Sequence, residues 1–214
     1  MTSVTKAYFC AHQINDMTIK KAIAIIIGIL AIDQWTKMYV KTHFLPGSMG
    51  EWEIASWFRI HFVENDGMAW GTVIPGEYGK LILTLFRIAA VIGIGYWLNQ
   101  SAKLHKPALL LVAISLIFAG ALGNILDSVF YGVIFDNNPF ETATLFSENP
   151  YGTWFHGRVV DMFYFPIWEG ILPTWIPIWG GKPFTFFNAI FNVADFSIST
   201  GVGILLVFNK RVFN

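Results

Sequence analysis

The stretch PALLLVAISLIFAGALGNILDSVF, residues 107–130, decides the fold class of this chain. Asp127 is its only charged residue, and most of the other side chains are aliphatic. A helix needs about 20 mainly apolar residues to span the hydrocarbon core of a bilayer. The stretch therefore predicts a transmembrane helix.

Three further runs of similar length and composition occupy residues 20–40, 80–98 and 186–209. The whole chain fits this pattern, since 55% of its 214 residues are hydrophobic and 13% are charged. Ordinary soluble domains contain about 25% charged residues. The sequence therefore predicts a membrane all-α bundle of four transmembrane helices, forming one integral membrane domain over residues 1–214.

Basic residues are concentrated in three short segments, residues 1–21, 99–106 and 207–214. These basic residues are Lys6, Lys20, Lys21, Lys103, Lys106, Lys210 and Arg211. Because Lys and Arg accumulate on the cytoplasmic side of membrane proteins, we expect both termini to be cytoplasmic. The two long segments, 41–80 and 131–185, would then lie on the outer side.

The two outer segments are rich in tryptophan. They contain Trp52, Trp57, Trp70, Trp154, Trp168, Trp175 and Trp179. Since Trp is typical of membrane interfaces, we expect both segments to lie against the bilayer. Loose alternation of β-branched and aromatic residues predicts strands near 52–56 and 58–64, followed by a Gly-rich turn. The region 131–185 is predicted to be loop, because 136–156 is polar and the Pro and Gly residues of 166–183 forbid a long helix.

The composition also excludes several classes of function. The formal net charge is zero, whereas a nucleic-acid-binding protein is expected to carry a basic patch. One cysteine cannot build a disulfide framework or a Cys-based metal cluster. The five histidines lie outside the predicted spans, and the GxSxG, HExxH and P-loop motifs are absent. We therefore expect no nucleic-acid partner, no metal site and no organic cofactor.

Four aspartates lie inside or beside the predicted spans: Asp33, Asp127, Asp161 and Asp195. In the predicted orientation all four lie toward the outer leaflet. Ionisable groups in a membrane are costly and often mark functional sites. Two carboxyl groups at one depth suit general acid/base hydrolysis, because like charges a few ångströms apart cannot both ionise and one carboxyl keeps its proton.

Structural interpretations of these aspartates stay open. Asp33 precedes Lys37 by four residues, a spacing that allows an ion pair on a helix surface. Two asparagines each precede an aspartate by three residues, and each amide can hydrogen-bond that carboxylate or a neighbouring helix. These pairs are Asn124–Asp127 and Asn192–Asp195.

Two other protein classes also stay open. Intramembrane carboxylates occur in proton- or cation-coupled transporters, although the inner halves of the first, third and fourth predicted spans contain almost no polar groups for an ion pathway. An assembly or scaffold subunit is the second alternative, and it would tolerate Asn in place of each aspartate.

Five blocks of the chain, in order, resemble the prolipoprotein signal peptidases (signal peptidase II), which are membrane aspartic proteases of bacteria. The blocks are DQWTK (33–37), NDGMAWG (65–71), GALGNILDS (120–128), VVDMF (159–163) and FNVADFSISTG (191–201). The resemblance implies a four-helix membrane fold in the cytoplasmic (inner) membrane. It also implies a small outward-facing β-cradle, here about residues 47–75, and an active site at the outer leaflet.

The same resemblance implies roles for individual residues. The catalytic pair would be Asp161 and Asp195. The supporting or substrate-binding residues would be Asp33, Lys37, Asn65, Gly67, Asn124, Asp127 and Asn192. Such enzymes cleave the signal peptide just before a diacylglyceryl-modified cysteine. The expected partners are prolipoproteins, membrane lipids and inhibitory cyclic peptides of the globomycin type.

Two features depart from the family pattern. Ser128 stands where an Arg usually follows the Asp of the third block. Arg87 either snorkels toward the outer headgroups or, with Arg158 as a second candidate, replaces that Arg as the positive charge beside Asp127. The chain is also longer than usual on both sides of Asp161, which we expect to affect substrate access more than chemistry.

Overall fold

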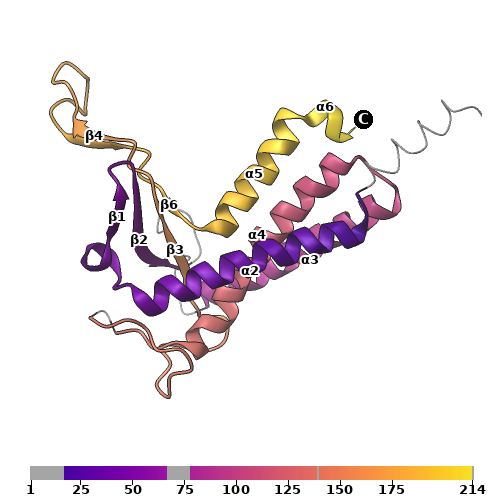
Figure 1. Ribbon diagram of the computed structural model, residues 1–214, viewed down its shortest axis with the longest axis horizontal. Helices are drawn as coiled ribbons and strands as arrows, with labels where there is room; N and C mark the ends of the chain where they lie inside the picture. Colours follow the sequence, from indigo (N-terminus) through magenta and orange to yellow (C-terminus); the bar gives the residue numbers. More distant parts are fainter. Residues whose placement is uncertain (1–16, 67–77, 139, 214) are drawn as a thin grey trace, which may run out of the picture. The chain divides into compact units, whose positions relative to one another are not determined.

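The computed structural model describes residues 17–66, 78–138 and 140–213, and Figure 1 labels their helices and strands. Contacts divide this part of the chain into two compact units. Unit 1 comprises residues 17–33, 82–125 and 193–213. Unit 2 comprises residues 34–66, 78–81, 126–138 and 140–192. The sequence predicted one integral membrane domain, and the two units are described separately below.

Three long apolar helices confirm the first three predicted spans: α2 (Ile19–His43), α3 (Gly79–Lys103) and α4 (Ala108–Ile134). Each is long and apolar enough to cross a membrane. In the most apolar 18-residue stretch of each helix, the share of residues buried within the protein is 50% for α4, 22% for α2 and 17% for α3. Large apolar side chains on α2 and α3 are therefore exposed, which is typical of a surface that faces lipid.

The fourth apolar run is helical only in its second part. Strand β6 (Ile190–Phe191) precedes α5 (Val193–Val207), and α6 (Asn209–Phe213) follows it. The prediction of one helix over 186–209 is therefore wrong at its N-terminal end. A short apolar run such as FFNAIF suits a strand as well as a helix, and its pattern does not separate the two. Among the described residues, three helices rather than four reach spanning length.

The core of unit 1 forms where α2, α3, α4 and α6 meet. Its buried side chains are Ala22, Ile26, Leu98, Leu110, Leu111, Ile114, Ala119 and Val212. Gly201 allows α5 to pack closely against α4. A Cβ at this position would lie only 2.7 Å from the carbonyl oxygen of Ala113, so a larger residue would clash. In the same contact the hydroxyl of Ser197 donates to the carbonyl oxygen of Leu116 at 2.8 Å. Such close approach of helix backbones is typical of helix pairs in membranes.

Unit 2 is built on a four-stranded antiparallel sheet of order β1-β2-β3-β6. A short 3₁₀ helix, η1 (Gly47–Gly50), precedes β1 (Trp52–Ala55) and β2 (Phe58–Asn65). These two strands confirm the strands predicted near 52–56 and 58–64. The Gly-rich turn expected after them lies outside the described residues beyond residue 66.

The prediction of loop holds for the described residues of 136–156, and 166–183 contains no long helix, but the wider outer region 131–185 is not all loop. This region contains β3 (Val159–Tyr164), which pairs with both β2 and β6, and β4 (Trp168–Ile171), which pairs with β5 (Pro183–Phe186). All but one residue of β3 are buried. A strand buried on both faces shows no alternation of apolar and polar residues, so its sequence lacks the usual strand signal.

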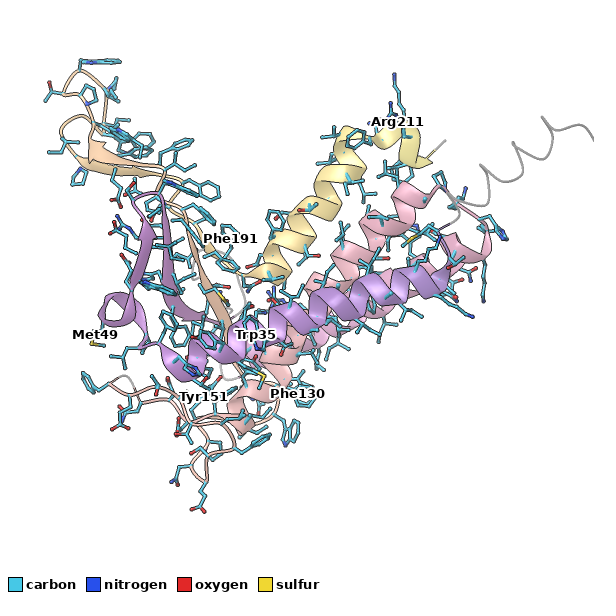
Figure 2. All side chains as sticks on the ribbon, in the orientation of Figure 1. Trp35, Met49, Phe130, Tyr151, Phe191 and Arg211 are labelled. Atoms are coloured by element: carbon cyan, nitrogen blue, oxygen red, sulfur yellow. The ribbon has the colours of Figure 1, made fainter. Side chains whose placement is uncertain are left out.

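The core of unit 2 joins the ends of α2 and α4 to the sheet. Its buried side chains are Val40, Ile60, Phe62, Tyr131, Phe135, Val160 and Met162. The segment 136–156 contributes to this core, because Ala143, Leu145 and Tyr151 pack against it. Tyr151 is labelled in Figure 2. The segment therefore packs against the core, although its polar composition predicts a surface loop.

Candidate active site

Asp161 lies on β3, an inner strand of the sheet in unit 2 between β2 and β6, and is 5% exposed. Its Oδ1 accepts a hydrogen bond from Nδ2 of Asn192 at 2.7 Å. Its Oδ2 accepts a second bond from Nδ2 of Asn65 at the end of β2. Both oxygens of the carboxylate are thus oriented by amide donors from the two neighbouring segments.

Asn192 links this carboxylate to the strand backbone. It is fully buried, and its Nδ2 also donates to the carbonyl oxygen of Val160 at 3.1 Å. A buried amide is costly unless it is hydrogen-bonded, so these bonds fix the position of the side chain. The sequence placed Asn192 inside a helix, but the structure places it between β6 and α5.

Asp195 lies in unit 1, in the first turn of α5. Its Oδ1 accepts a hydrogen bond from Nδ2 of Asn124 on α4 at 2.8 Å. The N-terminus of a helix stabilises negative charge, because its backbone N–H groups point toward it. The Asp195 carboxylate also interacts electrostatically with the guanidinium of Arg87 on α3.

Asp33 supports the same end of α5. Its Oδ1 accepts a hydrogen bond from the backbone N–H of Ala194 at 2.9 Å, and its side chain is fully buried. Two glycines of α4 leave room for this contact. A Cβ at Gly123 would lie 2.6 Å from Oδ2 of Asp33, and a Cβ at Gly120 would clash with the carbonyl oxygen of Ala194. The two glycines of GALGN (120–124) therefore allow α5 and the Asp33 side chain to approach α4 closely.

Asp127 and Lys37 form a buried ion pair in unit 2. Lys37 Nζ lies 2.8 Å from Oδ2 of Asp127, and both side chains are fully buried. Oδ1 of Asp127 accepts a hydrogen bond from Gln34 Nε2 at 2.9 Å. Oδ2 also lies 3.4 Å from the backbone nitrogen of Val160, which donates to it. The pair therefore supports the backbone next to Asp161.

This arrangement bears on the Arg that the family pattern would place after Asp127. Lys37 supplies the positive charge beside Asp127. Arg87 interacts with Asp195, and Nη1 of Arg158 lies 3.6 Å from a Glu64 oxygen. A role of either Arg beside Asp127 stays a prediction.

A second buried ion pair in unit 2 joins Lys41 to Glu64, and the sequence did not predict it. Lys41 is 1% exposed, and its Nζ lies 5.2 Å and 5.1 Å from the ring centroids of Phe135 and Tyr151. The only signal in the sequence is the four-residue step from Lys37, which places both lysines on one helix face. Burial raises the pKa of the Tyr151 phenol, so this ring stays neutral beside the lysine.

Glu64 connects this second pair to the candidate site. It immediately precedes Asn65 in β2, and it pairs across the sheet with Val160, the neighbour of Asp161. The Lys41–Glu64 pair therefore holds the part of β2 that presents the Asn65 amide.

The structure describes all but one of the predicted site residues, since Gly67 lies outside the described part of the chain. Each hydrogen-bonded or ion-paired group lies within one unit. Unit 2 contains Asp161 with Asn65 and Asn192, and Asp127 with Lys37. Unit 1 contains Asp195 with Asn124, and Asp33 with the start of α5. The two predicted catalytic aspartates thus belong to different units.

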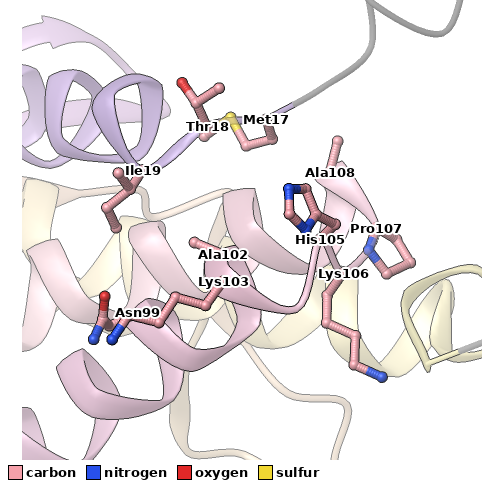
Figure 3. A pocket seen from close by; sticks show the side chains of 10 residues that line it. All are labelled: Met17, Thr18, Ile19, Asn99, Ala102, Lys103, His105, Lys106, Pro107 and Ala108. Atoms are coloured by element: carbon pink, nitrogen blue, oxygen red, sulfur yellow. The ribbon is translucent and has the colours of Figure 1, made fainter.

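None of these residues lines a pocket of about 650 Å³ at the turn between α3 and α4. Figure 3 shows the residues that line it: Met17, Thr18, Ile19, Asn99, Ala102, Lys103, His105, Lys106, Pro107 and Ala108. Among the described residues, this lining contains no carboxylate, so it does not suit acid/base hydrolysis. In the described part of the chain, no group of three or more His, Cys, Asp or Glu side chains is placed to hold a metal ion.

Three apolar helices of spanning length, joined to small antiparallel sheets, define a multi-pass membrane protein. Two solved structures, each described as a bacterial membrane enzyme determined by the in meso method, share this fold. The structure at 2.3 Å resolution aligns with a TM-score of 0.61 and 25% identity over 94% of each chain. The structure at 1.9 Å resolution aligns with a TM-score of 0.60 and 25% identity, over 91% of this chain and 95% of the other.

Sequence comparison assigns the family. A family model described as signal peptidase (SPase) II matches residues 25–210. A lipoprotein signal peptidase of Porphyromonas gingivalis is 48% identical over 198 residues, covering 90% of this chain and 84% of the relative. A lipoprotein signal peptidase of Amoebophilus asiaticus is 37% identical over 189 residues, covering 86% and 76%. The chain therefore belongs to the signal peptidase II family, and is a protease.

Proposed function

We propose that this chain is an aspartic endopeptidase that removes the signal peptide from diacylglyceryl-modified prolipoproteins by cutting before the lipid-modified cysteine. The observation that carries the proposal is the carboxylate of Asp161, because both of its oxygens accept amide hydrogen bonds from Asn65 and Asn192. A carboxylate oriented in this way is prepared for general acid/base chemistry.

Asp195 is the proposed second catalytic carboxyl group, and the covalent chain supports this pairing. Asn192, which binds Asp161, precedes Asp195 by three residues. Consecutive Cα atoms are about 3.8 Å apart, so three steps span at most roughly 11 Å. The Cα atoms of Asn192 and Asp195 are therefore within this distance of each other.

In the proposed reaction the two carboxyl groups share one proton, because two nearby negative charges repel each other. The ionised carboxylate takes a proton from water while the water oxygen bonds to the scissile carbonyl carbon. The protonated carboxyl donates its proton to the carbonyl oxygen. The C–N bond then breaks as the first carboxyl protonates the leaving amine, and the new hydroxyl returns its proton to the second. This sequence requires neither a metal nor an organic cofactor.

The other predicted site residues have supporting roles in this proposal. Asp33 and Asn124 hold the start of α5 and the side chain of Asp195. Asp127 and Lys37 hold the backbone beside Asp161. Gly67 is proposed as a position where a substrate peptide or lipid approaches the backbone closely.

We propose that both units form one integral domain of the bacterial inner membrane, with cytoplasmic termini and the active site at the outer leaflet. The concentration of Lys and Arg at the termini and in the 99–106 segment supports this orientation. The acyl chains of the substrate would remain in the bilayer, which places the scissile bond near the membrane surface. Such an enzyme should be inhibited by cyclic peptides of the globomycin type.

The test is cleavage by the purified full-length protein in lipid nanodiscs. A diacylglyceryl-modified prolipoprotein should lose the mass of its signal peptide, and the matched precursor without lipid should stay intact. A globomycin-type cyclic peptide should block the reaction, and a metal chelator should not. Absence of the product, or equal cleavage of the unmodified precursor, would contradict the proposed function.

A further inference from the structure

The β4–β5 hairpin of unit 2 exposes large apolar side chains around its turn. Trp175 is 79% exposed and Ile178 is 84% exposed. Ile171 and Trp179, on either side of them in the chain, are also exposed. Figure 2 shows side chains of the hairpin pointing outward from the β4 ribbon and the adjoining turn. Exposed apolar patches of this kind mark interaction surfaces.

The turn satisfies many of its own backbone donors. Leu172 N–H donates to the Lys182 carbonyl at 3.0 Å, and Gly181 N–H donates to the Leu172 carbonyl at 2.9 Å. Further N–H groups donate to carbonyls within the turn, namely those of Ile176, Trp179, Gly180 and Lys182. The prolines of the turn have no N–H to satisfy. Internal hydrogen bonding is the condition for placing backbone in a medium without water.

The backbone at Ile178 adds a second observation. Its φ is 71°, in the left-handed region that β-branched residues rarely adopt. Such conformations are strained and persist where surrounding interactions hold them. Since the Ile178 side chain is 84% exposed, an environment outside the protein would supply the apolar contact.

The charge of the hairpin points to the kind of partner. Lys182 is the only charged residue in the segment 170–187. Glu169, at the base of the hairpin, interacts with Arg59 at 3.2 Å. Anionic lipid headgroups attract basic residues at the membrane surface, and Trp is typical of the membrane interface. A bilayer is always near this hairpin, because α2, α3 and α4 belong to the same chain.

We propose that the turn of the β4–β5 hairpin, residues 172–182, inserts into the interfacial layer of the bilayer that holds the helices. Trp175, Ile178 and Trp179 enter the apolar boundary, and Lys182 contacts anionic headgroups. The hairpin thereby anchors unit 2 to the lipid surface. This anchoring does not depend on peptidase activity.

A fluorescent probe at the turn tests the proposal. In a Cys10→Ser background, which removes the single cysteine, Ile178→Cys is labelled with a nitrobenzoxadiazole fluorophore. The protein is reconstituted in vesicles of phosphatidylethanolamine and phosphatidylglycerol, with or without doxyl-labelled lipids. Glu148→Cys, an exposed position in the polar segment of unit 2, is the matched control.

The probe at position 178 should emit at shorter wavelength than the probe at position 148, and doxyl lipids should quench it more strongly. Quenching at position 178 no stronger than at position 148 would overturn the proposal. A shift to shorter wavelength without lipid quenching would also overturn it, because the turn would then be covered by protein.

A second pair of variants tests the two tryptophans without deleting the hairpin. Adding Trp175→Glu and Trp179→Glu to the labelled protein should abolish lipid quenching at position 178, because charged side chains are expelled from the apolar boundary. Adding Trp175→Phe and Trp179→Phe should preserve it. Equal quenching in the Glu and Phe variants would refute insertion through these side chains.

Discussion

Replacing Lys37 with Met removes the cation that contacts Asp127 while keeping most of the side-chain volume. The two charged groups are 2.8 Å apart and fully buried. Removing one partner of a buried ion pair costs about 3–5 kcal/mol, since the other charge stays in a medium that solvates it poorly. A change of 1 kcal/mol shifts the Tm of a domain of this size by roughly 2–4 °C. We therefore expect Lys37→Met to lower the Tm by about 10 °C.

Thermal unfolding of the purified protein in detergent micelles measures this effect. The double variant Lys37→Met/Asp127→Asn should recover part of the lost Tm, because a neutral amide needs no cation beside it. Lys103→Met, at an exposed position near the end of α3, is the control and should unfold like the wild type. The reasoning would be refuted if Lys37→Met unfolded like this control, or if the double variant were no more stable than the single one.

Three further changes test other parts of the structure. Asn65→Ala should lower kcat by about 10- to 100-fold in a cleavage assay, because a hydrogen bond to the charged Asp161 contributes about 1.5–3 kcal/mol; an unchanged kcat would remove Asn65 from the site. Lys41→Met should destabilise the fold by about 3 kcal/mol, and adding Glu64→Gln should restore part of this loss in thermal unfolding. The N–H of Thr144 lowers the pKa of Asp136, so the contribution of this carboxylate to stability is lost as the pH falls through its folded-state pKa. Asp136→Asn should therefore lower the Tm at about pH 7, and this difference should shrink as the pH falls through the folded-state pKa of Asp136.

The spanning helices were predictable because a bilayer imposes a length and a composition on any helix that crosses it. The residue at which α5 begins was not predictable. Phe186 and Ile190–Phe191 lie in strands, but their apolar side chains would fit a helix equally well. The same limit applies to β3, whose burial on both faces removes the alternating pattern.

The sequence predicted these site residues but did not determine their partners. Spacing along the chain left two partners open for each asparagine, namely the aspartate three residues later or a neighbouring helix. The structure joins Asn124 to Asp195, and Asn192 to Asp161. Asn65 is 96 residues from Asp161 in the chain, and only the pairing of β2 with β3 brings them together. Contacts of this kind depend on sheet register, which no local pattern encodes.

Asp161 and Asp195 are the residues proposed to carry out the proteolysis. The most direct measurement compares the cleavage of a diacylglyceryl-modified prolipoprotein by the wild type, Asp161→Asn, Asp195→Asn and the control Asp66→Asn. Asp66 is the control because its carboxylate pairs with Lys80 at 2.7 Å and is not a proposed catalytic group. We expect no detectable product from the two site variants, because an amide cannot exchange the proton that the reaction requires. All four proteins should insert into the membrane, and turnover by either site variant comparable with that of the control would contradict the account.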